Sequence, residues 1–117
     1  MGRLNPELMR GSLDLMLLTV LSGGQKYGYL LQQELRTASH GMVEIQAGTL
    51  YPLLHRLEAD KLIKSSWDES TGRRRKWYAL TEAGRKRLSQ QAREWHTYAE
   101  CVRSMLSPVL GPVPETT

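Results

Sequence analysis

The fold of this chain is decided by the stretch QAGTLYPLLHRLEADKL, residues 46–62. Its leucines recur every three or four residues, the spacing of one apolar stripe on an α-helix. The stripe consists of Leu50, Leu53, Leu54 and Leu57. At about 100° per residue, the opposite side carries small residues, hydroxyls, one aromatic ring and nitrogen-rich side chains. That outer side consists of Gly48, Pro52, His55 and Ala59, flanked by Thr49, Tyr51 and Arg56.

This outer side is unusual for a plain solvent surface, and helices that enter the major groove of DNA need such a mixture. Pro52 indicates where the helix begins, because proline loses the bond to the carbonyl of Gly48 and is best tolerated near a helix start. Gly48 has no side chain and can lie against a partner surface. The alternative for this stretch alone is an ordinary amphipathic helix that happens to contain a proline.

The residues before this helix predict two more helices. The apolar run 13–21 contains Asp14 and is too short to cross a bilayer, so we expect a buried helix. Residues 27–36 predict a second helix, with Tyr27, Leu31 and Leu35 on its inner face. Residues 42–45 are expected to form either a short strand or an extended approach to the third helix.

A basic β-hairpin is predicted after Leu62. Residues 63–68 alternate weakly, 69–73 are turn-like around Gly72, and 74–80 read as a returning strand. Segment 61–87 has nine basic and three acidic residues, a net charge of +6. The whole chain has a net charge of +4, so the remaining residues sum to −2. A localised basic stretch favours nucleic acid as partner, although a bare run of charge is often only a solvated face.

A long helix is predicted from its cap, Thr81, to about Leu106, before Pro108. Its apolar residues follow the spacing of a coiled-coil seam, and no second helix in the chain has this length. A partner subunit is therefore expected to cover the seam. The Pro- and Gly-rich tail, residues 108–117, is expected to be disordered. The seam consists of Leu88, Ala92, Trp95, Ala99, Val102 and Leu106.

The composition argues against several classes of protein. With 117 residues, 40% hydrophobic and 24% charged, the chain suits one domain with a modest core. Cys101 is the single cysteine, which rules out an intrachain disulfide and fits the cytoplasm. The histidines lack metal-ligand spacing, and no catalytic motif is recognisable. We therefore expect no metal, no cofactor and no enzymatic activity, and the N-terminus shows no secretion signal.

Four segments together resemble the PadR-like transcriptional regulators. They are LDL at 13–15, YGY at 27–29, GTLYPLLHRLE at 48–58 and GRRRKWYALTEAG at 72–84. Each is weak alone, but their order over roughly residues 8–105 is specific. The predicted fold is mainly α with a small β-hairpin: a winged helix-turn-helix over residues 1–80 and a C-terminal dimerisation helix over 81–107. The single C-terminal helix resembles the short subfamily.

The resemblance implies a homodimer that binds a double-stranded DNA operator of imperfect two-fold symmetry, usually as a repressor. Some short members bind flat aromatic compounds between the subunits, and Trp95 lies at the corresponding place. The alternative for Trp95 is a dimer-core aromatic with no ligand role. The residues expected to bind DNA are Gly48, Thr49, Tyr51, Pro52, His55 and Arg56 on the helix, and Arg73, Arg74 and Lys76 in the hairpin.

Plainer alternatives exist for these contacts. Tyr51 is expected either to contact a phosphate or to pack under the hairpin. Arg56 is expected either to contact DNA or to form a salt bridge with Asp60. For the whole chain, the alternative is a winged-helix module that binds another protein, which would not need the basic hairpin. RNA is also compatible with the charge alone. A steep fall of duplex affinity with salt distinguishes DNA binding from protein binding.

Overall fold

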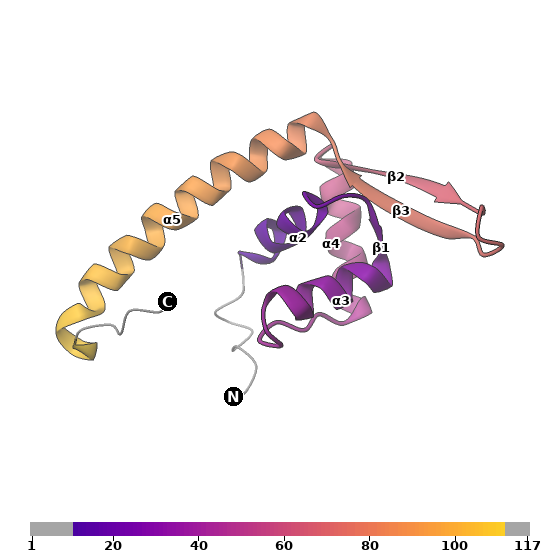
Figure 1. Ribbon diagram of the computed structural model, residues 1–117. Coiled ribbons are helices and arrows are strands. Elements are labelled where there is room, and N and C mark those ends of the chain that lie inside the picture. Colours follow the sequence, from indigo (N-terminus) through magenta and orange to yellow (C-terminus); the bar gives the residue numbers. More distant parts are fainter. Residues whose placement is uncertain (1–10, 112–117) are drawn as a thin grey trace.

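The computed structural model describes residues 11–111, and these form a mainly α-helical domain with one small sheet. Three short helices pack together, a two-stranded hairpin projects to one side, and a long helix leaves on the other (Figure 1). This arrangement is a winged helix-turn-helix, as predicted. The elements are α2 (Leu13–Leu21), β1 (Lys26–Tyr27), α3 (Gly28–Ala38), α4 (Ala47–Ala59), β2 (Ile63–Asp68), β3 (Arg75–Leu80) and α5 (Glu82–Leu110).

The core is built from aliphatic side chains of the three short helices and the base of the hairpin. The predicted stripe of α4 is buried, with Leu50 and Leu54 fully inaccessible. In α2, Leu17 and Leu18 are equally inaccessible, whereas Met16 is only partly covered. The helix α2 is therefore buried on one side, and its other side stays partly open.

The predicted hairpin is confirmed, and its strands pair antiparallel from Ile63 opposite Leu80 to Asp68 opposite Arg75. The structure adds a strand that the sequence analysis missed: β1 pairs with β3 and gives the sheet order β1-β3-β2. Two residues are too few for a period-two signal. The prediction that Tyr27 lies inside the second helix was wrong, because Tyr27 is extended, pairs with Trp77 and only precedes α3.

Residues 43–46 form no strand and lead directly into α4. Of the two predicted conformations, the structure therefore has the extended approach. Side chains supply the hydrogen bonds that a strand partner would otherwise provide. The Val43 amide donates to Ser39 Oγ at 2.9 Å, and Gln32 Nε2 donates to the Ile45 carbonyl at 2.9 Å. These bonds fix the chain that leads into α4.

The start of α5 is tied to the end of α4 through Thr81. The Thr81 hydroxyl accepts from the Gly84 amide at 3.0 Å, which confirms the predicted cap. The same hydroxyl donates to the Lys61 carbonyl at 2.7 Å, and the Thr81 amide donates to the Leu62 carbonyl at 3.1 Å. The direction of α5 is therefore set by the domain from which it leaves.

The predicted end of the long helix before Pro108 was wrong, because α5 runs to Leu110 with Pro108 inside it. Proline has a helical φ and removes only its own bond to the preceding turn, so a helix end tolerates it. Gly111, with φ of 73°, ends the helix and donates to the Ser107 carbonyl. Residues 108–110 of the predicted tail are thus helical. Residues 112–117, and residues 1–10 of the predicted first domain, lie outside the described residues.

Gly84 allows a close crossing of two segments, and we expect Gly84→Ala to destabilise the fold. A Cβ at this position would lie 2.0 Å from the Leu62 carbonyl oxygen, a backbone atom that cannot turn aside. Overpacking of this kind costs about 3 kcal/mol. The midpoint of urea unfolding should fall, with the slope unchanged.

Gly48→Ala is the matched control, because a Cβ at this helical position meets nothing within 4 Å. We expect it to stabilise the fold by up to about 1 kcal/mol, since alanine is the better helix former. If Gly84→Ala unfolded at the same urea concentration as wild type, the crossing at Leu62 would not be tight.

Candidate nucleic-acid interface

The outer side of α4 is exposed along its whole length. Because the leucine stripe is buried, every α4 residue predicted to bind DNA is accessible. The ideal Cβ of Gly48 meets no atom within 4 Å, so a partner surface can approach the backbone there. These exposed residues are Gly48, Thr49, Tyr51, Pro52, His55 and Arg56.

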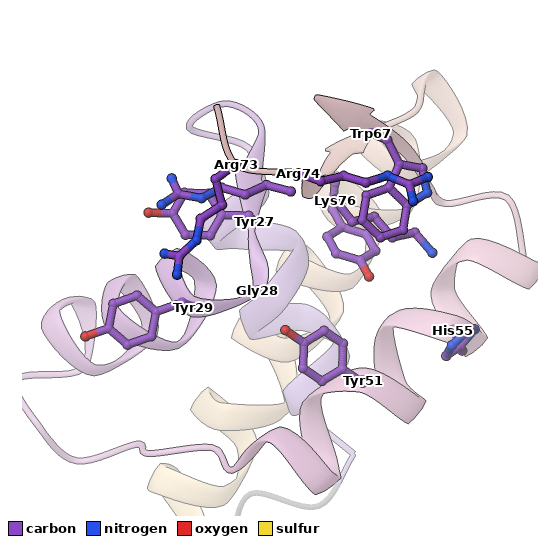
Figure 2. A pocket seen from close by; sticks show the side chains of 11 residues that line it. Tyr27, Gly28, Tyr29, Tyr51, His55, Trp67, Arg73, Arg74 and Lys76 are labelled. Atoms are coloured by element: carbon purple, nitrogen blue, oxygen red, sulfur yellow. The ribbon is translucent and has the colours of Figure 1, made fainter. Parts of the chain in front are cut away.

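A hollow of about 790 Å³ separates α4 from the hairpin, which forms the wing. We call it the basic hollow, because four of its lining residues are cations and none is acidic. Figure 2 shows Tyr51 and His55 on the α4 side, with Trp67, Arg74 and Lys76 on the wing. Its lining residues are Tyr27, Gly28, Tyr29, Tyr51, His55, Trp67, Arg73, Arg74, Arg75, Lys76 and Tyr78.

Aromatic rings hold several of these cations in place. Trp67 lies opposite Lys76 in the sheet, and the Arg74 guanidinium lies 4.2 Å from the centre of the Trp67 ring. Arg75, one residue along the chain, lies instead over the ring of Tyr27 at 4.4 Å. A cation on a ring keeps its full charge, so the wing remains attractive to an anion.

Sequence reasoning missed this aromatic lining. The residues Trp67, Tyr27, Tyr29 and Arg75 were not predicted to belong to the site. The signal that could have found Trp67 is the hairpin register, which sets it opposite Lys76 once Gly72 is taken as the turn. The contribution of β1, in contrast, depends on a pairing that no local pattern reveals.

Tyr51 lies between α4 and the start of α3. A Cβ on Gly28 would come within 2.1 Å of the Tyr51 hydroxyl, so this hydroxyl lies close to the Gly28 backbone. The Tyr51 side chain is nevertheless 42% exposed. The Tyr51 hydroxyl therefore packs beside the start of α3, part of the ring remains accessible, and the contact with a phosphate stays a prediction.

The wing is fixed to α4 by partly buried polar groups. Ser65 Oγ donates to Glu58 Oε2 at 2.5 Å, which joins β2 to α4. Burial raises the pKa of the neighbouring Tyr78 hydroxyl, and the Tyr51 phenol and the Glu58 carboxylate raise it further. The bond between Ser65 and Glu58 holds the wing beside α4.

A second hollow, of about 640 Å³, lies on the opposite side of α4, towards the start of α2. We call it the α2-side hollow; it contains Arg56 together with a carboxylate. Arg56 Nη2 lies 2.5 Å from Asp14 Oδ1, so the salt-bridge partner is Asp14 and not Asp60 as the alternative had it. Its lining residues are Gly11, Leu13, Asp14, Gly48, Thr49, Pro52, Leu53 and Arg56.

The seam residues of α5 lie in different surroundings. Leu88 packs against the core, Ala99 and Val102 are half-buried, and Ala92, Trp95 and Leu106 are exposed. The Trp95 side chain borders a largely apolar hollow of about 340 Å³ between α2 and α3, which we call the Trp95 hollow. Its lining residues are Ser12, Leu15, Met16, Thr19, Val20, Leu35, Ala38, Ser39, Val43 and Trp95.

Residues 11–111 contain no group of three His, Cys, Asp or Glu residues able to hold a metal ion. Among the same residues, no helix is long and apolar enough to span a membrane.

An exposed helix in a helix-turn-helix, flanked by a basic wing, defines a winged-helix DNA-binding protein. Residues 17–90 match the family model of the transcriptional regulator PadR-like family. The chain is 40% identical over 87 residues to the transcriptional regulator Rv3488 of Mycobacterium tuberculosis, covering 74% of this chain and 78% of that protein. The chain therefore belongs to the PadR-like family of transcriptional regulators.

Solved structures agree with this assignment. A transcriptional regulator from Clostridium thermocellum superposes with a TM-score of 0.78 and 32% identity, covering 84% of this chain and 96% of that one. A PadR family transcriptional regulator from Eggerthella lenta superposes with a TM-score of 0.73 and 39% identity, covering 86% of this chain and 83% of that one. The chain is thus a DNA-binding transcriptional regulator and not an enzyme.

We expect the wing to bind the DNA backbone. Replacing Arg73 and Arg74 with alanine should weaken binding to all duplexes similarly. It should also reduce the slope of log affinity against log salt by about one for each phosphate that the wing no longer binds. Fluorescence anisotropy at several salt concentrations measures both quantities.

Arg93→Ala removes one positive charge, against two in the wing variant, from the exposed surface of α5 and should leave the slope unchanged. A change of site preference without a change of slope would mean that the wing reads sequence rather than backbone.

Proposed function

We propose that this regulator is a repressor that binds a pseudo-palindromic operator as a homodimer. The observation that carries the proposal is the exposed outer side of α4 beside the basic hollow, which is lined by four cations and by no acidic residue. A helix seated in the major groove has a phosphate backbone on each side, and a basic wing suits one of these backbones. A bound dimer that covers a promoter is sufficient for repression, which is the usual action of PadR-like regulators. Because such a protein acts on chromosomal DNA, we assign it to the cytoplasm.

On α4, we assign close approach to Gly48 and Pro52, phosphate contacts to Thr49 and Tyr51, and base readout to His55 and Arg56. The small residues let the helix enter deeply, and hydroxyls near the helix start suit phosphate oxygens. Arginine and histidine supply donors for base edges. In the wing, Arg73, Arg74 and Lys76 are assigned to the backbone, because they line the basic hollow.

The length and exposure of α5 support the homodimer. The helix has 29 residues, against 13 for α4, the next longest in the described part of the chain. Its seam from Leu88 to Leu106 is about 27 Å long at 1.5 Å per residue. Left in water, a stripe of this size with Trp95 half exposed would be an unusually large apolar patch. A two-fold mate helix would cover it and set two α4 helices about 34 Å apart.

The Trp95 hollow supports a small aromatic effector. Its volume of about 340 Å³ lies within the range of ligand sites, and its walls are mostly aliphatic. A flat ring stacked on the Trp95 indole would contact both α5 and α2, the two helices that position the dimer. The alternative remains that Trp95 packs only against its mate in the dimer core.

The base-reading assignment predicts a loss of specific binding. Replacing His55 and Arg56 with alanine should cost about 1–3 kcal/mol for each base that is no longer bound and relax preference at that position. Anisotropy titrations on a selected duplex and on single-base variants measure this. Arg93→Ala serves again as the control, and unchanged affinity with unchanged preference would remove this face from the proposal.

The dimer assignment predicts that a charge in the seam lowers both dimer content and DNA affinity. Val102→Glu would bury a carboxylate against its symmetry mate, an arrangement that the dimer cannot satisfy. Thr97→Glu, on the opposite side of α5, should leave the dimer intact. Sedimentation at micromolar concentration measures assembly, and a wild-type monomer that binds its site tightly would contradict the dimer.

A further inference from the structure

Arg56 is held by a carboxylate of another helix, whereas the wing cation Arg74 is ion-paired, at 3.6 Å, to Glu69 in its own hairpin. The Arg56 guanidinium is paired to Asp14, which lies in a different helix and 42 residues away in sequence. Both side chains stay accessible, with 59% of Arg56 and 32% of Asp14 exposed. The pair therefore lies at the surface that α4 presents, and an approaching duplex would meet both partners.

The helices that carry the pair are firmly anchored. Asp14 lies in the first turn of α2, and the following turn buries Leu17 and Leu18 completely. Arg56 precedes Leu57, whose side chain is 1% exposed. Since neither helix can turn without exposing leucine, the position of the carboxylate fixes where the guanidinium lies.

A carboxylate beside an arginine changes which DNA groups that arginine can bind. The pair has no net charge, and the Asp14 oxygens repel a phosphate that comes close. A base edge is uncharged and is not repelled in this way. Arg56 uses Nη2 towards Asp14, and the remaining guanidinium donors can form a fork towards two acceptors.

We infer that Asp14 is a positioning and specificity-determining residue: it aims Arg56 at a guanine and keeps it from the phosphate backbone. Guanine is the base concerned, because its O6 and N7 offer two major-groove acceptors to one arginine. This inference rests on the proposed binding of α4 in the major groove. It distinguishes Arg56, which reads a base from the α2-side hollow, from the arginines of the wing, which bind backbone from the basic hollow.

The test uses the full chain with Asp14→Asn, which keeps the shape of the side chain and removes its charge. Anisotropy is measured on a duplex selected by the wild-type protein, on the same duplex with single G·C pairs changed, and on an unselected duplex. We expect affinity for the unselected duplex to rise, with a salt slope steeper by about one, because Arg56 gains a phosphate. Discrimination at one G·C pair should fall about tenfold.

Glu100→Gln is the matched control. It also removes one negative charge, and it breaks the ion pair between Glu100 and Arg103 on α5. It should change neither discrimination nor slope. Asp14→Glu, which keeps a carboxylate, should retain more discrimination than Asp14→Asn. In an Arg56→Ala background, Asp14→Asn should no longer change base preference. Thermal unfolding of each variant confirms that all of them are folded.

The inference is overturned if Asp14→Asn preserves discrimination at every G·C pair while the wild-type protein prefers its selected duplex. It is also overturned if Asp14→Asn changes preference equally in the Arg56→Ala background. Both results leave the proposed function standing. A wild-type protein that shows no preference among duplexes would instead contradict the proposed function itself.

Discussion

The burial of four leucines on one side of α4 determines what the rest of the molecule can do. Leu50, Leu53, Leu54 and Leu57 are all at most 6% exposed, and each buried leucine stabilises the fold by about 2 kcal/mol. Turning α4 about its axis would expose this stripe, so its other side is held outward. The Ser65 bond to Glu58 and the Thr81 bonds to Lys61 and Leu62 then position the wing and α5 relative to that outward side.

The two flanks of α4 differ in charge, and this difference organises the proposed interface. The basic hollow on the wing side has cations stacked on aromatic rings and no acidic lining residue. The α2-side hollow has one cation, Arg56, and the carboxylate of Asp14 beside it. Phosphate binding fixes the register of a protein on DNA, whereas base contacts specify the sequence. The arginines of the wing therefore suit the backbone, whereas Arg56, neutralised by Asp14, suits a base edge.

Local sequence patterns predicted the elements well, and non-local contacts explain what they missed. The leucine spacing, the turn at Gly72 and the Thr81 cap are encoded within a few residues, so α4, the hairpin and the start of α5 were predictable. The strand β1 exists only because Tyr27 meets Trp77, which lies far along the chain. The partner of Arg56 was sought on the same helix, at Asp60, but packing of α2 brought Asp14 closer. Pro108 was taken as a helix end, although Gly111 performs that role.

Selection of duplexes from a random pool by the wild-type protein tests most directly whether α4 reads DNA as one half of a two-fold dimer. If α4 reads the major groove in a two-fold dimer, the enriched sequences contain an inverted repeat. Its half-sites should lie about 10 base pairs apart, or a multiple of that distance, and it should include a G·C pair within each half-site. A selected pool indistinguishable from the input would contradict sequence reading by α4, and a single half-site without symmetry would contradict the two-fold dimer.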